Sequence, residues 1–222
     1  MQVPRRAEGP RLDSAAMDER ERILVTGGAG FIGSHLVDLL LQRSGTDVVV
    51  LDKLTYAGTR ANVSMHGDDP RFTFVHGDVA EASTVGPLVD GADRVIHAAA
   101  ESFVDRSIED SRAFVLSNVL GTQVVLEACR ELETPLVFVS TDEVYGSNEG
   151  EPFVEVDAMR PRNPYAASKA GADLLVQSYV ATYGLRASTV RGTNAYGPRQ
   201  HPEKAIPTFA MAALQEIGRA HV

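Results

Sequence analysis

The sequence predicts an α/β fold, a doubly wound parallel β-sheet with helices on both faces. Three observations support this prediction. Short apolar runs rich in β-branched residues alternate along the chain with longer stretches of helical period. A glycine cluster, Gly27 to Gly33, joins the first apolar run directly to a helical pattern. The unusual polar residues all follow apolar runs, and the ligands of parallel sheets bind at the edge where the strands end.

The first apolar run, 22–26, is expected to be a buried strand, and the glycine cluster follows it. Gly27, Gly30 and Gly33 lie at three-residue intervals, and the cluster also reads as G-x-G-x-x-G from Gly28. Backbone N–H groups at a helix N-terminus attract anions, and glycine lets a pyrophosphate approach closely. The pattern alone is also typical of a tight turn before a buried helix. Its position between strand and helix favours the anion site.

Further strands are expected at 47–51, 72–76, 92–97, 135–139 and 187–190. Long helices are expected at 111–132 and 165–183, and the first of them has a broad apolar face made of Phe114, Val115, Asn118, Val119, Thr122, Val125, Leu126 and Cys129. In a parallel sheet the polar residues after the strands share one edge. We therefore expect the glycine cluster to lie near Asp52, Asp78, 98–102, 141–143 and Asn194.

The composition narrows the function classes. The net charge of −9 argues against a nucleic-acid partner. No stretch approaches the roughly 20 apolar residues of a membrane span. Nothing in the pattern predicts a metal site. Cys129 is the only cysteine, so an intrachain disulfide is impossible and a cytoplasmic location is expected. We interpret Cys129 as a small buried hydrophobe.

The chain is expected to fall into four parts. Residues 1–20 are charged and proline-containing, and we expect a disordered or spurious extension, with Met17 as another possible start. Residues 21–200 are expected to form the nucleotide-binding domain, and 201–215 to begin a smaller, mostly missing substrate-binding region. Residues 216–222 correspond to the bases GAG ATC GGA AGA GCA CAC GTC, which resemble a sequencing adapter. We expect that tail to be non-native and the true protein to be longer; the alternative is a naturally short variant with an unremarkable tail.

Asp52 is placed to select the cofactor. It lies 19 positions after Gly33, at the end of the second expected strand. A carboxylate there can accept hydrogen bonds from an adenosine ribose and repel a 2′-phosphate. The bland interpretation is an aspartate that caps a turn. The pattern favours NAD over NADP, although Lys53 could soften the discrimination.

Tyr165 and Lys169 are four residues apart, so a helix places them on one face. A nearby ammonium lowers the pKa of a phenol, which makes tyrosine a usable acid or base. Such a pair is usually incidental packing when it occurs alone. Here it follows a glycine loop and a polar strand end at Ser140 and Thr141, which favours catalysis.

Together these motifs resemble the extended short-chain dehydrogenase/reductase family and its Rossmann-type fold. More narrowly, the segments 52–58, 100–108, 141–146 and 202–204 are similar to those of the dTDP-glucose 4,6-dehydratases. The similarity runs from about residue 22 to about residue 214. Its most specific part is the adjacent acid pair Asp142 and Glu143, which related epimerases and decarboxylases generally lack.

The resemblance implies roles for individual residues. NAD would be held by Gly27, Gly30, Phe31, Ile32, Gly33, Asp52, Lys53, Leu54, Thr55, Asp78, Val79, Ala98, Ala99, Ala100, Ser117, Tyr165 and Lys169. A nucleotide sugar would be held by Ser102, Thr141, Asn194 and Lys204. The catalytic residues would be Thr141, Asp142, Glu143, Tyr165 and Lys169. Family resemblance also implies a homodimer in which the two long helices pair with their copies.

The implied reaction is the dehydration of dTDP-D-glucose to its 4-keto-6-deoxy product. Tyr165, with Lys169 and Thr141, would remove the O4 proton while the C4 hydride passes to NAD. Glu143 would then take the C5 proton, Asp142 would protonate the departing C6 hydroxyl, and the hydride would return to C6. The bland interpretation of the acid pair is a helix cap.

Three residues depart from the family pattern. Phe103 stands where the family usually has His, Ala195 where it has Asn, and Ala205 where it has a larger apolar residue. Alternatives are therefore a 4-epimerase or dehydratase acting on a UDP or GDP sugar, and a non-catalytic NAD-binding protein. The present chain is expected to be weakly active or inactive by itself.

Overall fold

The structure, a computed structural model, describes residues 20–148 and 150–215. The residues 1–19 of the expected extension and the expected non-native tail, 216–222, lie outside the described residues. Among those described, no helix is long and apolar enough to cross a membrane.

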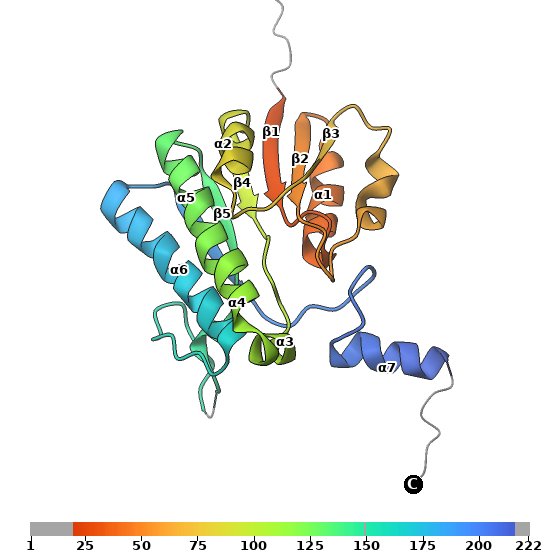
Figure 1. The fold of residues 1–222 in the computed structure, drawn as a ribbon, viewed down its shortest axis with the longest axis vertical. Coiled ribbons are helices and arrows are strands. Elements are labelled where there is room, and N and C mark those ends of the chain that lie inside the picture. The colour runs from red at the N-terminus through yellow and green to blue at the C-terminus, as the bar shows by residue number, and fades with distance from the viewer. Residues whose placement is uncertain (1–19, 149, 216–222) are drawn as a thin grey trace, which may run out of the picture.

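Six parallel strands form one sheet, as the sequence predicts (Figure 1). Its spatial order is β3-β2-β1-β4-β5-β6, and the strands are β1 Glu21–Thr26, β2 Thr46–Asp52, β3 Phe72–His76, β4 Arg94–His97, β5 Leu136–Thr141 and β6 Ala187–Gly192. In β1, Val25 pairs with Val50 of β2 on one side and with Ile96 of β4 on the other. The strand order therefore reverses between β1 and β4, where open α/β sheets bind their ligands.

The helices cover both faces of this sheet. They are α1 Phe31–Leu41, α2 Ala82–Asp90, α3 Val104–Glu109, α4 Ser111–Phe114, α5 Gly121–Glu131, α6 Pro164–Tyr183 and α7 Ala205–Leu214, with short 3₁₀ turns η1 Arg60–His66 and η3 Asp142–Tyr145. Figure 1 shows α2, α5 and α6 to one side of the strands and α1 to the other, whereas α7 projects away from these layers and buries no residue.

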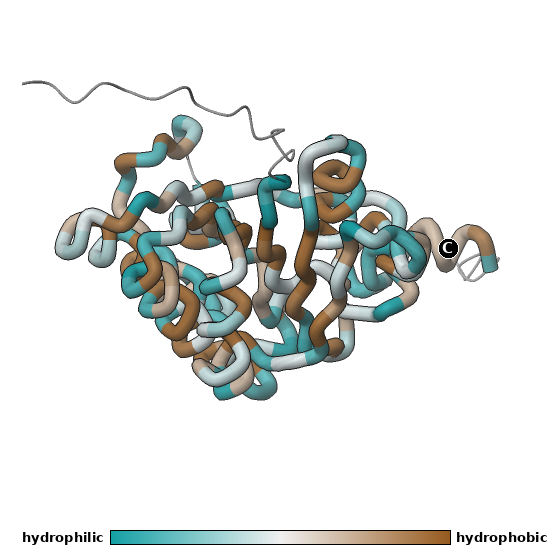
Figure 2. The backbone as a smooth tube through the Cα atoms, turned by 90° about the horizontal axis from the view of Figure 1, so that it is seen from above, coloured by the Kyte–Doolittle hydropathy of each residue, from teal (hydrophilic) through white to brown (hydrophobic). Residues whose placement is uncertain are grey.

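Alternate residues of the strands build a separate core on each face. Ile23, Val25, Val48 and Val50 pack with Val37 of α1 on one face. On the other face, residues of β1, β2, β4 and β5 pack with α2, α5 and α6. The strands at the centre of Figure 2 are accordingly mainly brown, the hydrophobic end of the scale. The sequence located all six strands to within two residues. For inner strands such as β1 and β2, the reason is that strands buried on both faces read as continuous apolar runs.

Cys129 lies fully buried in the second core, as expected of a small hydrophobe. Burial raises the pKa of its thiol to about 12. The thiol is therefore protonated at neutral pH and packs as an apolar group.

The helix expected at 111–132 is interrupted. A π-helical turn, η2 Val115–Leu120, separates α4 from α5. Val115 is 52% exposed, so its expected place on the buried face is wrong. The wider turn places Asn118 inward, where its carboxamide accepts from the Glu101 backbone N–H (2.8 Å) and donates to the Glu101 carbonyl (3.0 Å). This long-range pairing accounts for a π turn that local periodicity does not predict.

Candidate functional site

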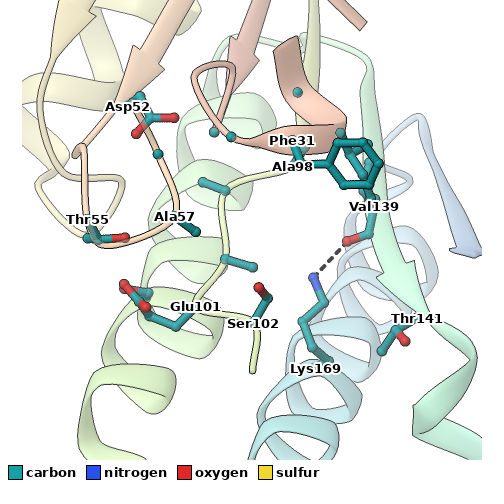
Figure 3. A pocket seen from close by; sticks show the side chains of 18 of the residues that line it. Phe31, Asp52, Thr55, Ala57, Ala98, Glu101, Ser102, Val139, Thr141 and Lys169 are labelled. Carbon is teal, nitrogen blue, oxygen red and sulfur yellow. Dashed lines mark hydrogen bonds between the residues drawn. The ribbon is translucent and has the colours of Figure 1, made fainter. Parts of the chain in front are cut away.

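One large pocket opens at the carboxyl ends of the strands, with a volume of about 590 Å³. That volume lies within the usual range of ligand sites. The pocket collects the glycine loop after β1, the residues after β2, β3 and β4, the end of β5, the first turn of α6 and the segment after β6. Figure 3 shows Asp52 and Thr55 on one side of it and Lys169 and Thr141 on the other, with Ser102 between.

Two glycines close the loop after β1. Gly27 has φ +72°, and a Cβ there would lie 2.6 Å from Ala99. A Cβ on Gly33 would lie 2.0 Å from the Gly27 carbonyl oxygen. Gly30 differs, because a Cβ there would meet only that same oxygen, at 3.3 Å. Gly30 caps α1 without any side-chain hydrogen bond, so the N–H groups of the first turn remain available to a phosphate.

Asp52 is buried at the end of β2 and lines the pocket. Its two carboxylate oxygens accept from the backbone N–H groups of Ala29 (2.9 Å) and Leu54 (2.8 Å). The glycine loop and the chain after β2 thus hold the carboxylate in place. Asp52 combines both interpretations offered by the sequence, since it caps a turn and faces the ligand pocket.

Asp78 lies beside Asp52 after β3. Its carboxylate accepts from the Lys53 ammonium (2.5 Å) and the Ala80 backbone N–H (3.0 Å). Burial would raise the pKa of the Asp78 carboxyl, but these hydrogen bonds outweigh it and the pKa is lowered. Lys53 is therefore paired with Asp78, which limits its effect on the charge that Asp52 presents.

Tyr165 stands in the first turn of α6, whose start is well defined. Asn163 caps the helix by accepting from the Ala166 backbone N–H (2.8 Å), and Pro164 occupies its first position. Burial and, to a smaller extent, the negative charge of Glu143 raise the pKa of the Tyr165 phenol to about 12, although the Thr141 hydroxyl acts in the opposite direction. The expectation that Lys169 lowers the pKa of this phenol is wrong for the chain alone.

The reason lies in the position of Lys169, which is 3% exposed. Its Nζ donates to the Val139 carbonyl (2.7 Å; Figure 3) and lies 4.4 Å from the centroid of the Phe138 ring. Burial lowers the pKa of Lys169 to about 7. An amine that is only partly charged at neutral pH stabilises a phenolate weakly.

The buried amine predicts a pH-dependent stability. Between about pH 7 and the ordinary lysine value of 10.5, the unfolded chain binds a proton that the folded chain lacks. The free energy of unfolding should therefore rise with pH, by at most about 1.4 kcal/mol per pH unit from this group. Urea unfolding of the unaltered chain and of Lys169→Met, from pH 7 to pH 9, measures the difference. Equal pH slopes in the two proteins would contradict the assigned pKa.

The acid pair sits on η3, directly after β5. Thr141 caps this turn, because its hydroxyl accepts from the Glu143 backbone N–H (3.3 Å). The Glu143 carboxylate lines the pocket and accepts from the Asn163 amide (3.4 Å). The Asp142 carboxylate accepts from the Thr141 hydroxyl (3.3 Å) but does not line the pocket. The cap of this turn is therefore Thr141 and not the acid pair, so the interpretation of Asp142 and Glu143 as a helix cap is wrong.

An ion pair between β6 and α6 is connected by a hydrogen bond to the end of η3. Arg191 of β6 donates to both carboxylate oxygens of Asp173 on α6 (2.8 and 2.9 Å), and Asp173 is fully buried. The same guanidinium donates to the Tyr145 hydroxyl (2.6 Å) at the end of η3. A bidentate pair of this kind fixes geometry, so Arg191 connects β6 and α6 to the end of η3.

The pocket brings together nearly all of the expected site residues. All of the residues expected to hold cofactor or substrate line it except Leu54, whose backbone supports Asp52 from a left-handed conformation (φ +55°). Asp142 is the one expected catalytic residue outside the lining. Of the departures from the family pattern, Ala195 lines the pocket, whereas Phe103 caps α3 outside it.

Several lining residues were given no role from the sequence, namely Tyr56, Glu101, Gln200, His201 and Glu203, although Glu101 lies within 98–102, which was expected at this edge. Burial raises the pKa of the Tyr56 phenol to about 12 and also raises the pKa of Glu101. Tyr56, Glu101 and Glu203 lie within 52–58, 100–108 and 202–204, segments that resemble the family, and this was the available signal. Gln200 and His201 line the pocket because the chain after β6 runs along it.

The described residues fit a dinucleotide. The open N-terminus of α1 suits a pyrophosphate, and the buried Asp52 carboxylate lies where a ribose could donate to it. In the described part of the chain, no three His, Cys, Asp or Glu side chains gather in a way that could hold a metal ion.

Comparison with known proteins identifies a matching family and several similar proteins. The profile of the GDP-mannose 4,6 dehydratase family matches residues 24–220. A dTDP-glucose 4,6-dehydratase of Streptomyces antibioticus is 52% identical over 202 residues, covering 88% of the chain and 59% of that protein. The low-salt glycan biosynthesis protein Agl12 of Haloferax volcanii is 50% identical over 192 residues, covering 86% of the chain and 62% of that protein.

Two solved structures are similar to the chain in both fold and sequence. The dTDP-glucose 4,6-dehydratase DesIV of Streptomyces venezuelae, crystallised with NAD bound, matches with a TM-score of 0.85 and 48% identity, over 88% of the chain and 62% of DesIV. A UDP-glucuronic acid 4-epimerase of Bacillus cereus matches with a TM-score of 0.83 and 31% identity, over 88% of the chain and 63% of the epimerase. The chain thus spans about 60% of the length of these relatives.

Proposed function

Because the chain belongs to the GDP-mannose 4,6-dehydratase family, we propose that it acts in an NAD-dependent dehydration of a nucleotide sugar, dTDP-D-glucose, to the 4-keto-6-deoxy sugar. The observation that carries the proposal is that Glu143 and Tyr165 line one pocket with Asp52 and the open end of α1. An acid–base group for oxidation, a second base and a dinucleotide cradle are thereby combined at one site.

NAD would lie along the edge of the sheet. Gly30 and the first turn of α1 would hold its pyrophosphate, Asp52 its adenosine ribose, and Asp78 with Val79 its adenine. NAD would supply a temporary hydride acceptor, taking hydrogen from C4 of the sugar and giving it to C6.

The residues of the chain would move the protons. Tyr165, which lines the pocket with Thr141, would take the proton of the O4 hydroxyl. Ketone formation at C4 acidifies the C5–H bond, and Glu143 would take that proton. Asp142, whose carboxylate lies on the Thr141 hydroxyl outside the pocket lining, would have to turn inward to give a proton to the C6 oxygen as the C6–O bond breaks, which forms a C5=C6 double bond and releases water. A proton from Glu143, exchanged with solvent, would return to C5 when C6 receives the hydride. Ser102, Asn194 and Lys204 would hold the substrate.

We expect the chain to bind NAD at least about tenfold more tightly than NADP, because a buried carboxylate repels a 2′-phosphate. Calorimetric titration with each cofactor measures the ratio. Asp52→Asn should reduce it, while Asp68→Asn, at an exposed aspartate on the same half of the molecule, should leave it unchanged. Tighter binding of NADP by the unaltered chain would remove Asp52 from its assigned role.

We also propose a cytoplasmic homodimer. The helices η2 and α6 expose several large apolar residues, namely Val115, Leu116, Leu120, Leu174, Val180 and Tyr183. Such a patch marks an interaction surface, and pairing with a second copy would bury it. Analytical ultracentrifugation should give twice the mass of one chain, and Leu174→Glu should shift it to monomer. Leu39→Glu, at an equally exposed leucine of α1, is the control, and a purely monomeric unaltered chain would refute the dimer.

A 4-epimerase acting on a UDP sugar is the second candidate, favoured by the likeness to the B. cereus epimerase. The acid pair at 142 and 143 favours dehydration. Incubating the chain and NAD with dTDP-, UDP- and GDP-hexoses separates these functions. A 4-keto-6-deoxy product from dTDP-glucose supports the proposal, an inverted C4 hydroxyl supports the epimerase, and NAD binding without turnover supports a non-catalytic protein.

A further inference from the structure

The chain after β6 crosses the mouth of the pocket. Residues 193–204, here called the crossing segment, run in blue below the strand ends from the α6 side towards the α1 side before α7 begins (Figure 1). Asn194 and Ala195 line the pocket from the start of this segment, and Glu203 and Lys204 line it from the end. The segment lacks regular secondary structure, so its position depends on side-chain contacts.

The first contact is made by Arg199. Its guanidinium donates to the Asp38 carboxylate on α1 and to the Asn62 carbonyl in η1 (2.9 Å). His66 approaches the other Asp38 oxygen (2.7 Å). Burial would raise the pKa of Asp38, but the hydrogen bonds from Arg199 and His66 outweigh it and the pKa is lowered. Arg199 itself has φ +66°, so this residue takes up a left-handed conformation to reach α1.

The second contact lies at the far end of the segment. The Tyr56 hydroxyl donates to Glu203 (3.1 Å), and the Arg106 guanidinium lies 3.7 Å from the centroid of the Tyr56 ring. Arg106 also approaches the other carboxylate oxygen of Glu203 (3.9 Å). The contacts of Arg199 and Tyr56 tie the crossing segment to the half of the molecule that carries the glycine loop, whereas Arg106 belongs to α3, which packs against α6.

We propose that Arg199 is a positioning residue, which through Asp38 holds the crossing segment over the pocket and so presents Asn194 and Lys204 to the sugar nucleotide. This inference rests on the proposed function, because it takes the ligand of the crossing segment to be a nucleotide sugar. Neither Arg199 nor Asp38 lines the pocket, so their effect on binding is indirect.

The physical reason is the conformational entropy that is lost when the crossing segment is held in one conformation. A segment without secondary structure samples many conformations unless contacts restrict it. A ligand that needs one of them binds more weakly, in proportion to the population of that conformation. Loss of Arg199 should therefore weaken a ligand of the crossing segment while sparing a ligand of the glycine loop. A merely structural role would affect both ligands together.

Two probes separate these sites on the full chain. ADP tests the glycine loop with Asp52 and Asp78, and thymidine diphosphate tests the crossing segment. The variants are Arg199→Ala, the milder Asp38→Asn and the two combined. The matched control is Arg71→Ala, because Arg71 pairs with Asp69 at almost the same side-chain exposure (22% and 23%, against 23% and 23% for Arg199 and Asp38).

We expect Arg199→Ala and Asp38→Asn each to weaken the binding of thymidine diphosphate about fivefold or more, which is a common size for the coupling between two sites. ADP affinity should stay within about twofold, and the combined variant should lose less than the product of the single losses. Hydrogen exchange of peptides within 193–204 should quicken in Arg199→Ala but not in Arg71→Ala.

Three results would each overturn the inference. They are an unchanged affinity of Arg199→Ala for thymidine diphosphate, an equal loss of affinity for both probes, and unchanged hydrogen exchange of peptides within 193–204. If the unaltered chain binds ADP but no thymidine diphosphate, the proposed substrate is wrong, and this inference is then wrong as well. If the unaltered chain binds ADP and thymidine diphosphate and the variants bind them with the same affinities, only the inference about Arg199 fails.

Discussion

Replacing Tyr165 by Phe is expected to slow oxidation at C4 of the sugar about 10²- to 10⁴-fold, the usual contribution of a positioned acid–base group. The phenol is buried in the first turn of α6, and this burial, together with the charge of Glu143, raises its pKa. Removing one hydroxyl leaves the helix cap at Asn163 and the surrounding packing in place. The effect should therefore fall on chemistry and not on folding.

Single-turnover experiments with the chain in excess over dTDP-glucose measure this step, as the rate at which the 4-keto sugar forms. Tyr183→Phe is the matched control, since Tyr183 ends the same helix and is 56% exposed. NAD affinity, measured in parallel, should change little in either variant. A Tyr165→Phe chain that oxidises C4 at the unaltered rate would exclude the phenol as the acid–base group.

Replacing Glu143 by Gln should affect a later step. The carboxylate lines the pocket, and Gln keeps its size and its contact with Asn163 while losing its basicity. Oxidation at C4 should proceed, whereas loss of the C5 proton should slow about 10²- to 10⁴-fold. The 4-keto sugar that still carries its C6 hydroxyl should therefore accumulate.

Mass spectrometry of the quenched reaction distinguishes that intermediate from the 4-keto-6-deoxy product. Glu151→Gln, at an exposed glutamate beyond η3, is the control. Unchanged exchange of the C5 hydrogen with solvent in Glu143→Gln would remove Glu143 as the base. Loss of C4 oxidation together with C5 exchange would assign Glu143 to the support of Tyr165 instead.

Sequence patterns predicted those features of the fold that depend on residues close together in the chain. Strands such as β2 are buried on both faces, so their apolar runs stand out between glycines and polar residues. The polar residues after these runs share one edge because all of the strands are parallel. Asp52 and Thr141 could therefore be assigned to one pocket from their positions alone.

The features that escaped prediction depend on contacts between distant residues. The π turn at 115–120 forms where Asn118 meets the backbone of Glu101. Lys169 turns towards the Val139 carbonyl, a contact that the Tyr-x-x-x-Lys spacing does not reveal. Tyr56 and Glu203 meet across 147 positions of sequence. Periodicity and spacing describe neighbours along the chain, so such pairings emerge only from the folded structure.

The most direct test of the proposed chemistry is the fate of hydrogen at C5. The unaltered chain, NAD and dTDP-glucose are incubated for a long period in deuterated water, and the sugar nucleotides are then examined by mass spectrometry and NMR. Proton removal by Glu143 followed by protonation from solvent predicts a 4-keto-6-deoxy sugar with one deuterium at C5. If a chain that binds both NAD and dTDP-glucose leaves C5 without deuterium in product and recovered substrate alike, dehydration through this pocket is contradicted.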